Sequence, residues 1–385
     1  LDDFVLEEQV GMSRSLTQGQ AHRARGMIVF AATHPSGGIR ELWGNLADAL
    51  AERGFETQCV AFYPPRWGEA GGGDGSGAGR SWLHFVSGPL RNPVRAVRLV
   101  FALARWLRAH EPRLVVTAMP AANVLVPIVA RWSSPATRVA ISHHSPVETH
   151  APLLNRLDAW SGQLRNVRAI ISVSHAVSAS LASKPAAYRA KRRAIRNALP
   201  PDIETYLSGM AGEVRDAPTQ RRIVSTGRLA YQKNYPMLLR ALAEVPDASL
   251  DIVGTGPDEA ELRALAEQLG IAERVRFLGV RPRREALAIL AGGDVFVQVS
   301  RFEGHSLGLI EAARVGLPLI VSNVPEQVEA VTAEGGDACG IVVPLDDDAA
   351  LAGAITAVLN DSAAYRRWSA AARRIAEEAR FDAVV

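Results

Sequence analysis

The chain alternates short, mainly apolar runs with longer stretches in which apolar positions recur every three or four residues. Short apolar runs bounded by turn residues predict parallel strands buried on both faces, and the longer amphipathic stretches predict helices. In the first half, the clearest helices are predicted at residues 39–53 and 94–110. The predicted strands of this half are residues 27–32, 57–62, 114–118, 139–142, 169–173 and 194–196.

A second set of the same kind begins at Arg222. Its predicted strands are residues 223–226, 250–253, 275–278, 295–299, 319–321 and 341–343. Its predicted helices are residues 235–243, 259–269, 283–290 and 349–359. Strand–helix alternation in both halves predicts an α/β fold of two doubly wound, Rossmann-like domains that face each other across a cleft.

These patterns divide the chain into four predicted parts. Residues 1–26 have weak periodicity and no apolar core of a secretory signal, so we expect a poorly ordered N-terminal segment. The first domain is predicted at 27–198 and the second at 199–362, with a proline-containing linker near their boundary. Residues 363–385 predict a C-terminal helix that can pack back across the cleft.

Composition narrows the class of protein. With 385 residues and 48% hydrophobic content, two full-sized cores are expected, and a charged content of 22% makes global disorder unexpected. Only two cysteines are present, which excludes a disulfide scaffold and fits a reducing, cytoplasmic compartment. No apolar run reaches the roughly 18 residues of a membrane span.

The net charge of +3 conceals an asymmetry between the halves. Residues 27–197 hold 21 Lys/Arg against 9 Asp/Glu, a charge of +12, whereas residues 198–385 hold 19 against 27, a charge of −8. A basic first half suggests an acidic partner, either a phosphorylated acceptor or the anionic inner face of a membrane to which the protein attaches peripherally. The alternative is the solvated surface of an arginine-rich chain.

Two basic clusters are the expected contacts. The first comprises Arg91, Arg95, Arg98, Arg105 and Arg108, which share one face of the helix predicted at 94–110. The second lies between Lys184 and Arg196. Aromatic residues are sparse around both clusters, so nucleic acid is not an expected partner.

The strongest candidate site lies between Glu303 and Glu311. These carboxylates flank a Gly-His-Ser-Leu-Gly loop that follows a buried strand and precedes a helix. In open α/β sheets, ligands bind outside the carboxyl ends of strands, and helix N-terminal amides face anions. Because carboxylates accept hydrogen bonds from hydroxyl groups, the stretch suits a sugar nucleotide.

Two other strand-end loops are expected to share this crevice. Arg228 and Lys233 follow the first strand of the second domain and can neutralise a diphosphate leaving group. Gly37 and Gly38 follow the first strand of the chain and allow backbone to approach a phosphate. Gly254 ends another strand, in a tight turn near the expected nucleotide pocket.

Histidines and an acidic run complete the candidates. His143 follows a strand of the first domain and is expected to face the cleft, where it can hydrogen-bond to a sugar hydroxyl or handle a proton. His144 lies beside it, so the choice between these two histidines for this position stays open. Asp346, Asp347 and Asp348 hold a D-x-D spacing that some transferases use for a metal, but they precede a helix, so we interpret them as capping residues. No metal or other cofactor is therefore expected.

Together, these stretches resemble the retaining glycosyltransferases of family 4. The segment from Glu303 to Glu311 matches the E-x7-E motif of that family, and residues 227–234 are similar to its diphosphate loop. Residues 252–257 and 275–279, the latter ending in Gly279, are similar to its donor-domain core. So are residues 172–174 and 196–198. The resemblance implies a GT-B fold, an acceptor-side first domain and a donor-binding second domain.

The resemblance also implies roles for single residues. Glu311 would hold the nucleotide ribose, Glu303 the sugar hydroxyls, and Arg228 and Lys233, helped by Gly38, the diphosphate. His143 would contact the donor sugar. The remaining expected donor contacts are Gly37, Gly254, Gly279, His305, Ser306, Leu307 and Gly308. Ser306 departs from the pattern, because many relatives carry glycine there, and this can change the loop around the sugar.

The predicted activity is therefore transfer of a sugar, with retained anomeric configuration, from a nucleotide diphosphate sugar to a hydroxyl acceptor. No carboxylate pair indicates a glycosidase. Two alternatives stay open: a sugar-nucleotide epimerase of the same fold, and a nucleotide-sugar-binding protein without turnover. A nicotinamide dehydrogenase is disfavoured, because the third glycine of the dinucleotide fingerprint is missing.

Overall fold

The structure is a computed structural model that describes residues 26–35, 37–64, 81–90, 92–210, 216–379 and 381. The predicted poorly ordered segment, apart from Gly26, lies outside these residues. So do Arg91 and the glycine-rich stretch at 71–79.

The first domain is built on a seven-stranded parallel sheet with the order β3-β2-β1-β4-β5-β6-β7. Its strands are β1 (Met27–Ala32), β2 (Glu56–Ala61), β3 (Trp82–His84), β4 (Leu114–Ala118), β5 (Arg138–His143), β6 (Val167–Ser172) and β7 (Arg192–Ala194). The order reverses between β1 and β4, so the loops after these strands diverge and leave a crevice at the carboxyl edge.

The second domain repeats this plan with a six-stranded parallel sheet, in the order β10-β9-β8-β11-β12-β13. Its strands are β8 (Arg222–Thr226), β9 (Ser249–Val253), β10 (Val275–Gly279), β11 (Val295–Gln298), β12 (Leu319–Ser322) and β13 (Ile341–Val343). The order reverses between β8 and β11, and these are the strands that carry the two loops predicted to meet.

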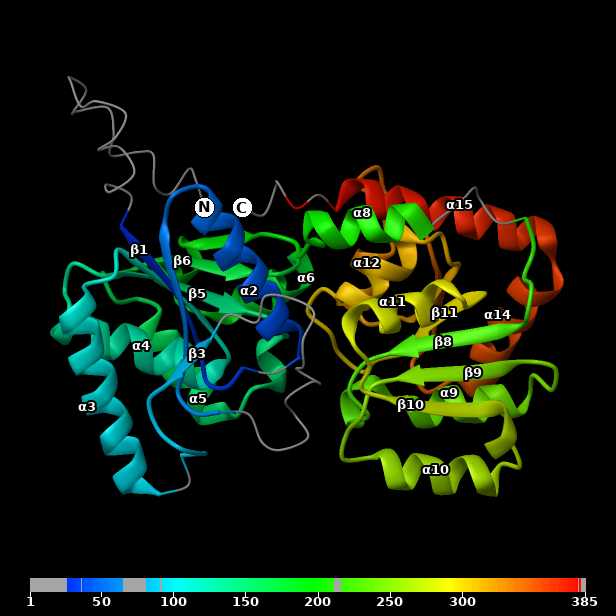
Figure 1. Ribbon diagram of the computed structural model, residues 1–385, viewed down its shortest axis with the longest axis horizontal. Coiled ribbons are helices and arrows are strands. Elements are labelled where there is room, and N and C mark those ends of the chain that lie inside the picture. The colour runs from blue at the N-terminus through cyan, green and yellow to red at the C-terminus, as the bar shows by residue number, and fades with distance from the viewer. Residues whose placement is uncertain are drawn as a thin grey trace.

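Helices cover both faces of the first sheet (Figure 1). One face packs on α3 (Pro93–His110), α4 (Pro120–Ser133) and α7 (Ala186–Arg189), and α5 (Pro152–Ser161) lies against α4. The other face packs on α2 (Gly37–Glu52), which buries Leu42, Trp43 and Leu46 against β1. The short helix α6 (His175–Ser180) follows β6.

The second sheet is covered in the same way. One face packs on α9 (Tyr235–Ala243), α10 (Glu259–Gln268) and α14 (Asp348–Asn360). The other face packs on α8 (Pro201–Met210), α11 (Arg283–Ala291), α12 (Leu307–Arg314) and α15 (Ser362–Glu378). The remaining helix, α13 (Pro325–Ala330), follows β12.

The C-terminal segment contacts both domains. The body of α15 packs on α12 and α14 within the second domain, so the helix itself does not lie across the cleft. Phe381, just beyond it, is 5% exposed and belongs to the hydrophobic core between β1 and α2 of the first domain. The Phe381 side chain therefore attaches the segment that follows α15 to the first domain.

Six described α-helices fall where the sequence pattern predicted no helix, and the three longest of them are α4, α5 and α8. The helices α4, α5 and α8 all begin with proline, which is tolerated at the first helical position. In α8, Ile203 and Leu207 pack on the second domain, so residues 201–210 of the predicted linker form a helix that belongs to that domain. Proline in these segments also suggests turns, and only packing decides between the two.

Candidate functional site

The candidate site lies where the reversal points of the two sheets face each other. The loops after β1, β8 and β11 all reach the space between the domains (Figure 1). Gly38, at the start of α2, lies against the Leu307 side chain, since a Cβ added to this glycine would be 3.8 Å from Leu307 Cδ1. The predicted phosphate turn of the first domain thus meets the predicted donor loop of the second.

Lys233 and Glu303 form the centre of the site. Lys233 Nζ lies 2.8 Å from Glu303 Oε1, and the two side chains are only 14% and 9% exposed. Lys233 Nζ is also 3.4 Å from Gln298 Oε1, which accepts a 2.8 Å hydrogen bond from Ser306 Oγ. Residues from three separate segments therefore converge, as the sequence predicted for Lys233 and Glu303. Gln298 was missed, although a polar residue ending an apolar strand is a usable signal.

Glycines allow two strand-end loops to touch. Gly227 and Gly254 both have φ of 143°, and a Cβ on Gly254 would lie 1.9 Å from the Gly227 carbonyl oxygen. A Cβ on Gly227 would lie 2.6 Å from Lys233 Cε, so the lysine stem crosses directly over this glycine. The amide of Gly254 donates to the carbonyl of Gly279 at 2.9 Å. The geometry explains these glycines by close backbone approach.

The loop between Glu303 and Glu311 contacts the first domain. A Cβ on Gly304 would lie 2.3 Å from the His144 carbonyl oxygen, so the two domains approach here through backbone. Ser306 occupies the N-cap position of α12, but its hydroxyl is turned toward Gln298 and caps no helix amide. A Cβ on Gly308 would meet Thr226 Oγ1 at 2.5 Å. The start of α12 is therefore held close to the end of β8.

Glu311 is tied to a bridge between the domains. It is 4% exposed, and Arg283 Nη2 donates to its Oε1 at 2.6 Å. Arg283 Nε lies 2.7 Å from Glu41 Oε1 on α2, as an ion pair without hydrogen-bond geometry. Burial raises the pKa of Glu41, an effect that Arg283 opposes and Glu311 reinforces. Sequence analysis missed Arg283 and Glu41, because no local pattern marks them.

Comparison with known families agrees with this geometry. The family described as "Glycosyltransferase Family 4" matches residues 36–202, and the one described as "Glycosyl transferases group 1" matches residues 213–375. Together they cover most of both domains. The chain belongs to the GT-B glycosyltransferases of the family 4 type.

Individual relatives match more than two thirds of this glycosyltransferase. The lipopolysaccharide core biosynthesis glycosyltransferase LpsD of Rhizobium meliloti is 27% identical over 87% of this chain and 88% of its own. A GDP-mannose-dependent phosphatidylinositol monomannoside mannosyltransferase of Mycolicibacterium smegmatis is 28% identical over 71% and 75%. The structure of Anabaena HepE with UDP and glucose matches with a TM-score of 0.73 at 18% identity, over 92% of this chain and 95% of HepE. The last likeness confirms the fold.

In this glycosyltransferase, His143 lies inside the first domain. It is 1% exposed, its Nε2 is 2.8 Å from Tyr188 Oη, and it is 3.6 Å from Asp158 Oδ1. Tyr188 and Lys184 both donate to Asp158 Oδ2. Burial alone would raise the pKa of Asp158, but His143 and Lys184 lower it to about 2. One face of His143 is therefore fixed by a buried polar cluster, and its contact with a donor sugar stays a prediction.

In this glycosyltransferase, His144, the second of the two strand-end histidines, contacts the loop between Glu303 and Glu311 through its backbone. Its carbonyl packs over Gly304, and its Nε2 is 2.9 Å from Ser142 Oγ. Burial, followed by the neighbouring His143, lowers the pKa of His144 to about 4. The residue is therefore neutral near pH 7.

The other expected residues divide between the crevice and its surroundings. Arg228 is exposed on the loop that carries Lys233. His305 is 8% exposed and turned toward a separate pocket. Asp347 Oδ1 accepts from the Ala350 amide at the start of α14, which confirms its capping role. Asp346 pairs with Arg301, and the described residues contain no group of three or more potential metal ligands.

Proposed function

We propose that this chain is a retaining glycosyltransferase that moves a sugar from a nucleotide diphosphate sugar to a hydroxyl acceptor without a metal ion. The observation that carries the proposal is the buried Lys233–Glu303 pair, located between two facing strand-edge crevices. It supplies a cation for a leaving phosphate next to a carboxylate for sugar hydroxyls.

The proposed reaction breaks the bond between the anomeric carbon of the sugar and the diphosphate oxygen. Negative charge then develops on the departing diphosphate, where Lys233, Arg228 and the first amides of α12 can stabilise it without reorganising. The acceptor oxygen bonds to the anomeric carbon on the face that the diphosphate leaves. The acceptor proton passes to the leaving phosphate, so no protein base is required.

Support for the donor class comes from two related proteins and from Glu311. The mycobacterial relative is described as GDP-mannose-dependent, and HepE was solved with UDP and glucose, so both involve nucleoside diphosphates. In this chain, Glu311 would accept hydrogen bonds from the ribose, exchanging its contact with Arg283 for the ligand. The base and the sugar stay open between these two precedents.

The experiment is incubation with radiolabelled UDP-glucose or GDP-mannose, with and without a membrane glycolipid extract as acceptor, followed by NMR assignment of the product anomer. We expect acceptor-dependent transfer with the donor configuration kept, and full activity in the presence of a chelator. Inverted product would overturn the retaining mechanism. Loss on chelation that manganese restores would overturn metal independence. Acceptor-independent conversion of the sugar nucleotide would instead support the epimerase.

A second part of the proposal is peripheral attachment of the first domain to an anionic lipid surface. On α3, Val94, Val97 and Phe101 are 58%, 54% and 68% exposed, and Arg98 and Arg105 are exposed beside them. The helix α5 adds exposed Leu153, Leu157 and Trp160, with Arg156 among them. Figure 1 shows α3 and α5 on either side of α4, in one layer of the domain. We call these exposed residues the α3–α5 face.

This face combines the two attractions that an interfacial surface needs. Exposed apolar side chains enter the boundary between headgroups and acyl chains, and each arginine adds about 1 kcal/mol near anionic lipid. Among the described helices, none combines the length and apolar character required to span a bilayer.

Four cations of the second predicted basic cluster are engaged within the protein, whereas Arg189 and Arg193 are exposed. Lys184 is 6% exposed and bound to Asp158, and Lys191 donates to two backbone carbonyls. Arg192 donates to the Ser178 carbonyl and Arg196 pairs with Glu329. These cations satisfy buried acceptors within the protein, because the chain folds back on them. We therefore place the main proposed lipid contact on the α3–α5 face.

A further inference from the structure

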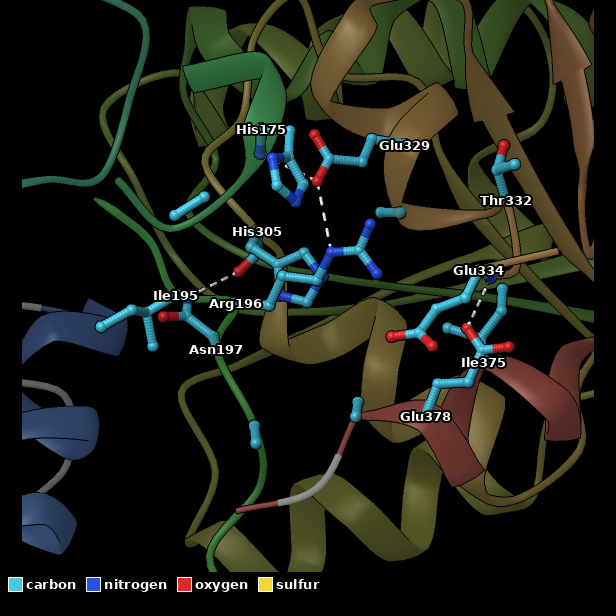
Figure 2. A pocket seen from close by; sticks show the side chains of 14 residues that line it. His175, Ile195, Arg196, Asn197, His305, Glu329, Thr332, Glu334, Ile375 and Glu378 are labelled. Carbon is cyan, nitrogen blue, oxygen red and sulfur yellow. Dashed lines mark hydrogen bonds and ion pairs between the residues drawn. The ribbon is translucent and has the colours of Figure 1, made fainter. Parts of the chain in front are cut away.

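A polar pocket of about 460 Å³ opens between the domains, on the side of the donor loop where β7 leads into the second domain. Figure 2 shows Arg196 and His175 from the first domain on one side and Glu334 and Glu378 from the second on the other. Glu329 on α13 closes it at a third side. Among the described residues, His305 is the only predicted donor contact that lines this pocket. The pocket is therefore distinct from the donor crevice.

His305, one of the residues that line the pocket, has an unsatisfied ring nitrogen. The residue is 8% exposed, and its carbonyl is fixed by a 2.8 Å hydrogen bond from Asn197 Nδ2. Burial, and then the charge of Arg196, lowers the pKa of His305 to about 4, so the ring is neutral near pH 7. Its Nδ1 is buried and has no hydrogen-bond partner among the described residues. Buried polar atoms are normally paired, so this one is expected to gain a partner from a ligand.

Arg196 supplies donors to the same space. Its Nε lies 3.3 Å from Glu329 Oε1, and Glu329 is held in turn by the amides of His175 and Ala176 at 2.9 and 2.6 Å. The guanidinium is thereby oriented. Among the described residues, its two Nη atoms make no hydrogen bond. These groups donate in a fixed planar fork, which can serve two oxygens at once.

The opposite wall supplies acceptors. Glu378 Oε2 accepts from the backbone amide of Glu334 at 3.0 Å, which fixes the Glu378 carboxylate, and Figure 2 shows the Glu334 side chain on the same wall. The lining holds one arginine against three glutamates with neutral His305, so an anionic ligand is disfavoured. Adjacent donors and acceptors around a neutral ligand are the pattern that several neighbouring hydroxyl groups can satisfy together.

We infer that this pocket binds a neutral saccharide unit. Its volume lies within the roughly 300–1,000 Å³ typical of small-molecule sites. Hydroxyl groups would donate to Glu334, Glu378 and His305 Nδ1 and accept from Arg196. The choice of a saccharide over another polyol rests on the proposed glycosyltransferase function. Because both domains contribute walls, an occupied pocket stabilises this relative placement of the domains.

The inference is tested by saturation-transfer NMR on the full chain with the methyl α-glycosides of glucose, galactose and mannose. We expect at least one glycoside to bind the wild type, and Glu334→Gln and Arg196→Lys each to weaken that binding about tenfold. Each variant is first checked for an unchanged circular dichroism spectrum and melting temperature. Glu303→Gln, in the donor crevice, is the control and should leave this binding unchanged.

Absence of binding by all three glycosides would overturn the inference, as would loss of binding confined to Glu303→Gln. Labelled sugar added to the bound glycoside would identify the ligand as the acceptor end of a glycan. Binding without incorporation would identify a separate saccharide site, and both results support the pocket. Failure of the proposed function is recognised separately, since a chain without transferase activity would still bind the glycoside.

Discussion

At the scale of single residues, Lys233 has two roles that cannot be separated, because both depend on its ammonium group. Its ammonium group is positioned to meet a leaving phosphate, and it neutralises Glu303 in a largely buried location. Removing one partner of a buried ion pair leaves the other charge uncompensated, which destabilises a protein more than the net contribution of the pair suggests.

For Lys233→Ala, we therefore expect turnover to fall about 100-fold, corresponding to the roughly 3 kcal/mol of a preorganised group facing developing charge. The melting temperature should also fall, because Glu303 loses its partner. Steady-state kinetics and calorimetry measure the two effects. Arg240→Ala, which removes an ion pair with Asp348 away from the crevice, is the control and should keep wild-type turnover. Unchanged turnover in a folded Lys233→Ala protein would remove the lysine from the mechanism.

A second residue-scale prediction concerns Gly254. Alanine there would place Cβ 1.9 Å from the Gly227 carbonyl, at a φ of 143° that side chains rarely adopt. We expect Gly254→Ala to lower the free energy of unfolding by about 2–3 kcal/mol, from overpacking and backbone strain. Gly335→Ala, with no atom within 4 Å of the added Cβ, should change it by less than about 0.5 kcal/mol. Equal stability of both variants in urea titrations would contradict the packing argument.

At the scale of the element, α3 presents two different faces. Leu99, Leu103 and Leu107 are buried against the sheet, whereas Val97 and Phe101 point outward. Arg95 is not free to act in docking, because its Nη1 donates to the Pro89 carbonyl at 2.9 Å. The side chains left for an external partner are therefore apolar ones interleaved with Arg98, Arg105 and Arg108.

Reversing the charge of these three arginines to glutamate should abolish most binding to phosphatidylglycerol vesicles in a flotation assay. Binding of the wild type should weaken steeply as salt rises, since the Debye length is about 8 Å at physiological ionic strength. Nucleotide binding by the second domain should not change. Reversal of the exposed Arg366 and Arg367 on α15 is the matched control and should leave flotation intact. If the wild type fails to float at low salt, the lipid proposal is wrong and the transferase assignment stands.

At the scale of the whole molecule, polar bridges hold the domains together at separate points. Arg283 joins Glu41 to Glu311 beside the donor crevice, and Glu329 joins α13 to the start of α6. Buried or partly buried histidines also respond to pH. The pKa values of His144, His150 and His305 are each lowered from 6.5 to about 4, in every case chiefly by burial.

These histidines predict an acid-sensitive fold. Between pH 6.5 and 4 the unfolded chain binds protons that the folded chain excludes, so the free energy of unfolding falls as pH is lowered. Each group contributes a slope of up to about 1.4 kcal/mol per pH unit. Urea denaturation between pH 7 and 4.5 measures the slope, and His150→Asn should reduce it, whereas substitution of the exposed His110 should not. A flat profile over this range would show that the histidines are accessible to protons.

The sequence by itself determined the architecture and the centre of the site. Runs such as residues 295–297 are apolar at every position, which favours a strand buried on both faces. Most of the thirteen strands in the described part of the chain were predicted from apolar runs of this kind. Once the strands are known, their carboxyl-end loops must share an edge. Lys233 and Glu303 were therefore predictable as neighbours from seventy residues apart, and their 2.8 Å contact confirms it.

Only the tertiary structure decided the contacts between elements that no local pattern relates. The buried arrangement around His143, the bridge through Arg283 and the polar pocket at Arg196 and His305 each join segments from different parts of the chain. Sequence shows which side chains carry charge, but burial and partner distance set how each charge behaves. For that reason Lys184 looked like a surface cation in the sequence and is instead a buried partner of Asp158.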